Sequence, residues 1–347
     1  MEITFALWCL ISCFWSQNII SSITIFSANA GLIFLYSITT SGLSTVRIKY
    51  IDIGFVIGIS IAIILFFVES SMGGIFHNNF KYYFQNNSLN KYSLYSLDRG
   101  CALLTISSWP LLEIFITKRK YYISCLLYLL ILYILCLSDS LASLVGFVIS
   151  GGVFLFIRVF SIKFSKYIRI FLILIFASFP LIAYNMNPST ISDRYSKLLP
   201  DSAKHRLFIW NFVSKKIISK PILGYGFGSS KKYVAPQEEM INYNGYYWSP
   251  LPLHPHNNVL QILFETGLIG FSLFLLSISK YLKKLEQMII VNPTIGGIFY
   301  ACFINYFVIG MISFSILQVW WVASAIWVML MLKYNVRNTQ DQNLRTY

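Results

Sequence analysis

The chain has 347 residues, of which 56% are hydrophobic and only 12% are charged. Soluble domains carry roughly 25% charged residues, so this composition excludes a water-soluble protein. The net charge of +14 does not indicate a nucleic-acid partner, because much of the lysine and arginine lies in short clusters beside apolar runs. We therefore predict an all-α polytopic membrane protein.

Ten apolar runs follow one another along the chain, most of them near the length of about 20 residues that a membrane-spanning helix needs. They cover residues 3–15, 19–38, 51–68, 101–117, 121–137, 141–160, 170–184, 259–279, 295–316 and 319–332. We predict about ten transmembrane helices from these runs. The first run lacks the basic start and small-residue cleavage site of a signal peptide, so we expect it to remain as the first span.

Basic residues between the runs predict the orientation. They fall in five clusters: Arg47/Lys49, Lys118/Arg119/Lys120, Lys163/Lys166/Arg169, Lys280/Lys283/Lys284 and Lys333/Arg337. All five clusters lie on one side of the membrane if the ten spans alternate, and short basic loops mark the cytoplasmic side. We predict a multi-pass protein of a bacterial inner membrane with both termini in the cytoplasm.

This topology divides the chain into four segments. Residues 1–184 are predicted to form an N-terminal transmembrane bundle of about seven spans, and residues 185–257 a large periplasmic loop that contains short helices and part of the candidate site. Residues 258–334 form about three C-terminal spans, and residues 335–347 form a cytoplasmic tail. The large loop is basic although it lies outside, so an anionic ligand would suit it.

Within the large loop, apolar residues follow Pro200 at helical spacing: Ala203, Leu207, Trp210, Val213 and Ile217. This stripe predicts a helix that lies on the membrane surface. Pro221 and the glycines Gly224, Gly226 and Gly228 then end the helix in a turn. These glycines either form an ordinary loop or allow the backbone to approach a ligand closely.

The large loop ends in two histidines, His254 and His256, at a predicted membrane boundary. The following Asn257, Gln261 and Glu265 are spaced four apart and therefore share one helix face. The positive end of the helix dipole disfavours imidazolium, so His256 is expected to be neutral and able to accept a proton. The alternative is an interfacial histidine bonded to a backbone carbonyl. For Glu265 we expect a contact in the helix interior rather than a catalytic role, and His254 is a spare base.

Two other groups of residues receive no chemical role from the sequence. The six cysteines lie in apolar runs without metal-ligand spacing, so we interpret them as small buried side chains and predict no metal site. The aromatic residues just before the histidines either stack on the rings of a ligand or lie at the membrane interface. They are Tyr243, Tyr246, Tyr247 and Trp248.

Two blocks of sequence resemble bacterial O-antigen ligases. His256-Asn257, nine residues, Gly267, two residues and Gly270 is similar to the histidine motif of that family. The block from His205 to Gly228 resembles the family's periplasmic segment, in which an arginine precedes Trp210 and a Pro-x-x-Gly-x-Gly turn. The two blocks occur in the order that the family has.

The resemblance implies a metal-independent, inverting glycosyltransferase of the GT-C class without a cofactor. The donor would be a glycan on undecaprenyl pyrophosphate, and the acceptor a sugar hydroxyl of lipid A core or another glycan; membrane lipids would be the other partners. Carried over by motif, His256 would take the proton of the acceptor hydroxyl, and Arg206 would bind the pyrophosphate. A neutral imidazole suits the first role and a guanidinium fork the second.

The sequence departs from the ligase pattern at Leu141, where ligases often carry an arginine. Arg99, in Asp98-Arg99-Gly100, resembles an Asn-Arg-Gly element of some members and would supply a second cation for the pyrophosphate. The alternative for Arg99 is an anchor at the membrane interface. Arg194 is a further candidate for the pyrophosphate, with a solvated loop charge as its alternative.

Three other functions remain to be weighed. An O-antigen polymerase uses the same donor, and the departure at Leu141 favours it, whereas the His256-Asn257 motif favours a ligase. A transporter or flippase for the lipid-linked sugar would show repeated halves or helices broken at the midplane, but the polar residues here gather at the outer boundary. An enzyme using sugar nucleotides would need larger cytoplasmic loops.

Overall fold

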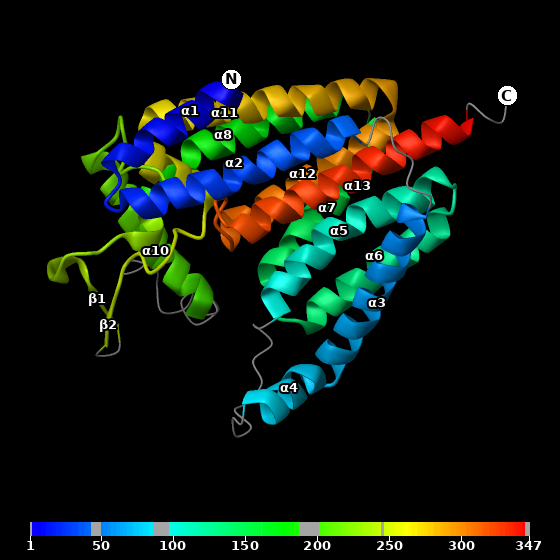
Figure 1. Cartoon of the computed structure of the whole chain (residues 1–347), viewed down its shortest axis with the longest axis horizontal. Helices are drawn as coiled ribbons and strands as arrows, with labels where there is room; N and C mark the ends of the chain where they lie inside the picture. The colour runs from blue at the N-terminus through cyan, green and yellow to red at the C-terminus, as the bar shows by residue number, and fades with distance from the viewer. Residues whose placement is uncertain are drawn as a thin grey trace. The chain divides into compact units, whose positions relative to one another are not determined.

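The computed structural model describes residues 2–42, 50–85, 97–160, 162–186, 201–243 and 246–343. In chain order, its helices are α1 (Glu2–Ser12), α2 (Ile19–Gly42), α3 (Ile51–Ser71), α4 (Ile75–Gln85), α5 (Asp98–Thr117), α6 (Tyr121–Leu137), α7 (Leu141–Phe160), α8 (Ile162–Asn185), α10 (Asp201–Ser219), α11 (Asn258–Val291), α12 (Pro293–Ile312) and α13 (Val319–Asn343). Short 3₁₀ turns cover Cys13–Trp15, Ser229–Lys232 and Gln237–Glu239. Figure 1 shows that these helices make up most of the chain.

The prediction of an all-α polytopic membrane protein is confirmed. Each of the ten predicted runs coincides with a helix, and within the described ranges eight helices are long and apolar enough to cross a membrane. The other two, α1 with its following 3₁₀ turn and α6, are apolar but shorter. The helix α11 extends past the predicted run because lysines, which end the apolar stretch, are good helix formers.

The helix predicted after Pro200 is also present, as α10. Of the predicted stripe, Val213 and Ile217 are buried, whereas Ala203, Leu207 and Trp210 are only partly buried. The third buried apolar residue is Ile209, which the predicted stripe did not include. After α10, the chain forms a small antiparallel hairpin in a region expected to be loop. Strand β1 (Ile241–Tyr243) pairs with β2 (Tyr246–Trp248).

The chain forms two compact units. Unit 1 consists of Met1–Ile33, Lys163–Glu286 and Gly310–Val322, and unit 2 consists of Phe34–Ile162, Gln287–Ile309 and Ala323–Tyr347. Each unit therefore combines segments from several parts of the chain. The division into four sequence segments stays a prediction about the membrane, which the two units do not address.

In unit 1, α1 runs antiparallel along α11, as Figure 1 shows. The indole N–H of Trp8 donates to the Thr266 carbonyl at 2.9 Å, and the carboxylate of Glu2 lies 3.9 Å from the ammonium of Lys284. The start of α8 lies beside the far end of α11, where Arg169 Nε donates to Glu286 at 2.8 Å. The long helix α11 is thus the central element of this unit.

In unit 2, the helices α3, α5, α6 and α7 pack on one another. The fully buried Trp109 of α5 contacts Phe147 and Phe154 of α7 with ring centroids about 6 Å apart. Gly146 allows close packing here, because an added Cβ would lie 2.8 Å from the side chain of Asn305 on α12. These contacts form the core of unit 2.

Candidate functional site

The helix α11 is broken at Gly267, and the turn after α10 fills the break. Gly267 has φ 63° and ψ −171°, which interrupts the helical hydrogen bonds on both sides. The amides of Tyr225 and Gly226 donate to the carbonyls of Phe264 and Glu265, both at 2.8 Å, and the Leu268 amide donates to Pro221 at 2.8 Å. The two blocks that resemble the ligase family therefore bind each other directly.

Glycine is required on both sides of this contact. A Cβ on Gly267 would lie 2.1 Å from the Ile222 carbonyl oxygen, and a Cβ on Gly226 would lie 2.6 Å from the backbone of Ser16. The turn glycines thus approach the protein's own backbone. Of the two sequence interpretations, the structure supports a packed turn rather than a backbone surface for a ligand.

The buried carboxylate of Glu265 holds the end of the same turn. It accepts hydrogen bonds from the Gly228 amide at 2.7 Å, from the Ser230 hydroxyl, and from the Gln261 amide at 3.1 Å. A buried donor left without an acceptor is unfavourable, so these bonds stabilise the buried Gly228 amide and Ser230 hydroxyl. The polar stripe on α11 therefore binds the turn, and Glu265 makes the interior contact that its position predicts.

Asn257 holds the start of α11. Its side-chain oxygen accepts from the Leu260 amide at 3.0 Å, which is the bond of a helix N-cap. Its side-chain amide donates to the Met311 carbonyl at 3.0 Å. Asn257 thus joins the helix start to the end of α12 and fixes the backbone that carries His256.

The two histidines converge on one backbone carbonyl. His256 Nδ1 lies 2.6 Å and His254 Nε2 lies 3.2 Å from the Ser313 oxygen, with ring centroids 4.2 Å apart. A carbonyl only accepts, so neutral His256 must carry its proton on Nδ1. This tautomer leaves Nε2 as the proton acceptor of the ring. His256 therefore makes the backbone-carbonyl contact expected of an interfacial histidine. It also keeps Nε2 as the proton acceptor that a catalytic base needs.

Arg206 lies on α10 near the histidines. The indole of Trp210, one turn along α10 from Arg206, donates to the Pro255 carbonyl at 2.9 Å, which holds α10 against the histidine segment. Burial lowers the pKa of His256 to about 3, and the charges of His254, Arg206 and His205 lower it too. Burial and Arg206 likewise lower the pKa of His254. The structure therefore brings Arg206, Trp210 and His256 together.

The other predicted site residues are not brought to this cluster by any described contact. Arg99 is the second residue of α5 and belongs to unit 2. Arg194 lies outside the described residues. Gly270 gives room for α1, because an added Cβ would lie 2.7 Å from the indole of Trp8. Leu141, at the position of the missing arginine, starts α7 in unit 2 and is exposed.

Sequence reasoning missed the two tryptophans that hold the broken helix. Trp8 donates to the carbonyl of Thr266, directly before the break, and Trp15 donates to the Leu223 carbonyl in the turn at 3.2 Å. The Ser313 carbonyl between the histidines was also missed. A tryptophan in an apolar run is typical of any membrane interface, so no signal in the sequence distinguishes these two.

A metal centre has no candidate in the described ranges, where no three His, Cys, Asp or Glu side chains gather in a ligand arrangement. The guanidinium of Arg206 beside the two histidines suits an anionic group. A guanidinium can bind a phosphate in bidentate fashion, and a neutral imidazole beside it can accept a proton. Together they are able to bind a phosphorylated molecule and deprotonate a hydroxyl.

Comparison with known proteins agrees with this chemistry. Residues 126–275 match the family model described as O-antigen ligase, and this range includes the turn, both histidines and Gly267. The chain is 45% identical over 334 residues to a "Putative polysaccharide ligase" of Rickettsia conorii, which covers 96% of this chain and 78% of the relative.

Proteins with the same description in Rickettsia typhi and Rickettsia prowazekii are 44% and 43% identical over 336 residues, 97% of this chain and 80% of each relative. No solved structure matches the chain. The identity to these relatives extends over nearly the whole chain, well beyond the two motif blocks. The chain belongs to the O-antigen and polysaccharide ligase family of glycosyl-transferring membrane enzymes.

Proposed function

We propose that the protein transfers a glycan from undecaprenyl pyrophosphate to a sugar hydroxyl of lipid A core, at the periplasmic face of the inner membrane. The observation that carries this proposal is the pairing of a neutral imidazole, with Nε2 as its base, and the Arg206 charge. The family supplies the class of reaction. The donor, the acceptor and the side of the membrane are our own assignment.

In the proposed step, His256 Nε2 takes the proton of the acceptor hydroxyl as its oxygen attacks the anomeric carbon. The new oxygen–carbon bond forms, the bond from that carbon to the pyrophosphate oxygen breaks, and undecaprenyl pyrophosphate leaves with the electron pair. Attack from the opposite face inverts the anomeric configuration. Arg206 binds the negative charge that develops on the pyrophosphate, so the step needs no metal ion.

Arg99 and Arg194 are proposed as further cations for the pyrophosphate. A pyrophosphate leaving group carries more than one negative charge, which a single guanidinium neutralises only in part. The guanidinium of Arg99 is the stronger candidate, because Asp98-Arg99-Gly100 is similar to a family element. Asn257, Gly267, Gly270 and Trp210 are proposed to position the reacting groups without touching them.

The test of the function is a lipopolysaccharide gel from cells that lack the gene. For a ligase, we expect bare core on the gel and polymer that accumulates on undecaprenyl pyrophosphate. The native gene should restore the ladder of bands from lipopolysaccharide that carries polymer. Core that carries a single repeat unit would make the protein a polymerase instead. Unchanged lipopolysaccharide in cells that lack the gene would overturn both assignments.

We expect both termini to be cytoplasmic and the α10–α11 connection to be periplasmic. Alkaline phosphatase is active only outside the cytoplasm, so a fusion after Lys231 should be active and a fusion after Arg119 inactive. Activity after Arg119 would reverse the orientation and place His256 on the cytoplasmic side. The basic clusters of the short loops are the physical reason for the expected result.

Arg206→Ala should lower kcat/KM for the lipid-linked donor by about 10²–10³-fold, the loss typical of removing one donor to developing negative charge. Arg206→Lys should recover only part, because an ammonium cannot form the bidentate contact. The matched control is Lys215→Ala, which removes an exposed cation nine residues along α10, on the opposite helix face. If Arg206→Ala and Lys215→Ala lower kcat/KM equally, Arg206 acts only through its contribution to the net charge.

The pH dependence should reflect the buried imidazole. With a pKa of about 3, His256 stays neutral as the pH falls through 6.5, where an ordinary histidine gains its proton. The acid limb of kcat/KM should therefore lie below pH 5. Bound pyrophosphate favours the imidazolium, so the acid limb of kcat should lie at higher pH. A half-maximal kcat/KM near pH 6.5 would contradict this assignment.

A further inference from the structure

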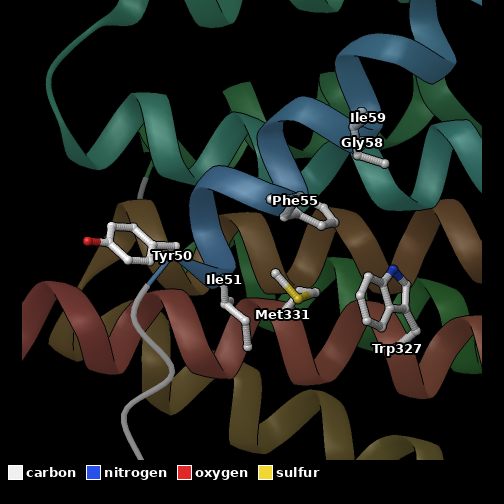
Figure 2. Close-up of a pocket in the computed structure, with 8 residues that line it drawn as sticks. Tyr50, Ile51, Phe55, Gly58, Ile59, Trp327 and Met331 are labelled. Carbon is white, nitrogen blue, oxygen red and sulfur yellow. The ribbon is translucent and has the colours of Figure 1, made fainter.

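A groove runs along the first half of α3 in unit 2 (Figure 2). Its volume is about 500 Å³, within the roughly 300–1,000 Å³ range of ligand pockets. Its walls come from α3 and α13 and include Tyr50, Gly54, Phe55, Gly58, Trp327 and Met331. The lining is largely apolar, so it favours an apolar occupant.

Two glycines keep the groove open. Gly54 and Gly58 are four residues apart and share one face of α3. A Cβ added to either glycine would meet no atom within 4 Å, so no part of the described protein fills this space. The rings of Phe55 and Trp327, with centroids 6.1 Å apart, close the groove on one side.

The length of the groove matches one leaflet. Its lining on α3 extends from Tyr50 to Ile59, and nine helical residues rise about 14 Å. The hydrocarbon core of a bilayer is about 30 Å thick, so the groove spans about half of it. A lipid acyl chain that enters from one membrane surface fits this depth. A long polyprenyl chain would extend beyond it.

The mouth of the groove is positively charged. Lys118 follows α5, and its ammonium lies 4.0 Å from the carboxylate of Asp52 at the start of α3. Arg119 and Lys120 come next, and all three basic side chains are exposed. Lys118 thus adjoins the carboxylate, and the two following residues add two more exposed cations to the same turn, which leaves net positive charge on the turn where an acyl chain would carry its headgroup.

From these observations we propose that the groove binds one acyl chain of an anionic glycerophospholipid, with the phosphate of its headgroup beside Lys118. The apolar depth, the one-leaflet length and the cationic mouth each match one part of that molecule. A basic turn at the membrane surface attracts anionic lipid, by a factor of about five per lysine. A second copy of the chain, docked on the Gly54–Gly58 face, is the competing occupant.

The experiment uses the full-length protein, freed of lipid in detergent, and phospholipids with brominated acyl chains, which quench tryptophan fluorescence on contact. The signal of Trp327 is the difference between the native protein and Trp327→Phe. We expect brominated phosphatidylglycerol to quench Trp327 at an about fivefold lower mole fraction than brominated phosphatidylcholine. Equal quenching by the two lipids would contradict the proposed preference for an anionic headgroup.

Two pairs of variants test the chain and the headgroup separately. Gly58→Leu fills the groove and should abolish quenching of Trp327, while Gly152→Leu, at another open helical glycine, should not. Lys118→Gln should remove most of the preference for phosphatidylglycerol, while Lys283→Gln should keep it. If quenching of Trp327 persists in Gly58→Leu, the acyl chain does not bind in the groove. If Gly58→Leu instead converts a dimer to a monomer in light scattering, without any lipid preference in the native protein, the face belongs to a second copy.

Discussion

Replacing His256 by alanine is expected to lower the rate of glycan transfer by about 10²–10⁴-fold, the range that a general base contributes. The KM for the donor should change little, because in our proposal His256 acts on the acceptor hydroxyl in the transition state. The measurement is kcat and KM of the purified protein in lipid nanodiscs with an undecaprenyl-pyrophosphate-linked glycan and isolated core. Added imidazole should restore part of the rate, because under our proposal the space that the variant vacates would adjoin the acceptor hydroxyl.

Two other histidines provide the controls for this experiment. His77→Ala removes an imidazole from α4 in unit 2 and should leave the rate unchanged. His254→Ala removes the ring that shares the Ser313 carbonyl with His256. It should slow transfer less, because the Nδ1 contact of His256 remains. If His254→Ala abolishes transfer and His256→Ala does not, the base is His254 and our assignment is wrong.

Gly267→Ala is expected to separate the turn from α11. At φ 63° and ψ −171°, Gly267 occupies a backbone region open almost only to glycine, and another residue there costs about 1–3 kcal/mol. The Cβ would also collide with the Ile222 carbonyl. Relaxing that collision breaks the hydrogen bonds to Tyr225 and Gly226, so both the melting temperature and the transfer rate should fall.

Limited trypsin digestion distinguishes a released turn from general unfolding. Lys220 and Lys231 flank the turn, so Gly267→Ala should be cut at these two sites faster than the native protein. The matched control is Gly152→Ala, at a helical glycine with open space around it, which should change stability by less than about 1 kcal/mol. A Gly267→Ala protein with native stability, cleavage and activity would show that the break is not required.

The sequence was sufficient to predict the long apolar helices, because apolar runs of this length have few other stable forms in a membrane. It also predicted α10 from its spacing and the interior role of Glu265. It did not predict α4, whose residues Ile75–Gln85 form no apolar run. The break at Gly267 could not be predicted, since the apolar run continues through it and an isolated glycine is tolerated within a helix. The break exists because Pro221 and Tyr225, about 40 residues earlier, supply the missing hydrogen bonds.

The candidate site was only partly predictable, because some of its contacts join segments that are distant in the sequence. The motif proposed His256 and Arg206 as site residues. The helix start predicted a neutral imidazole, whereas the structure lowers the pKa of His256 chiefly by burial. The partner of His256 is a backbone carbonyl, Ser313, and carbonyls carry no sequence signal. Trp8 and Trp15 likewise act through single N–H groups whose acceptors are set by tertiary packing. Hydrogen bonds between a side chain and a distant backbone carbonyl can be recognised only in the three-dimensional structure.

The docking of the turn on α11 has a consequence for how such enzymes diversify. Because Pro221–Gly228 and Glu265 tie the two helices at one end and Trp210 ties them at the other, the spacing of Arg206 and His256 does not depend on the chain between Glu239 and Ser249. Insertions or replacements in that segment, which includes the β1–β2 hairpin, should preserve chemistry. Evolution can therefore exchange this segment to accept new sugars while the reaction itself is inherited unchanged.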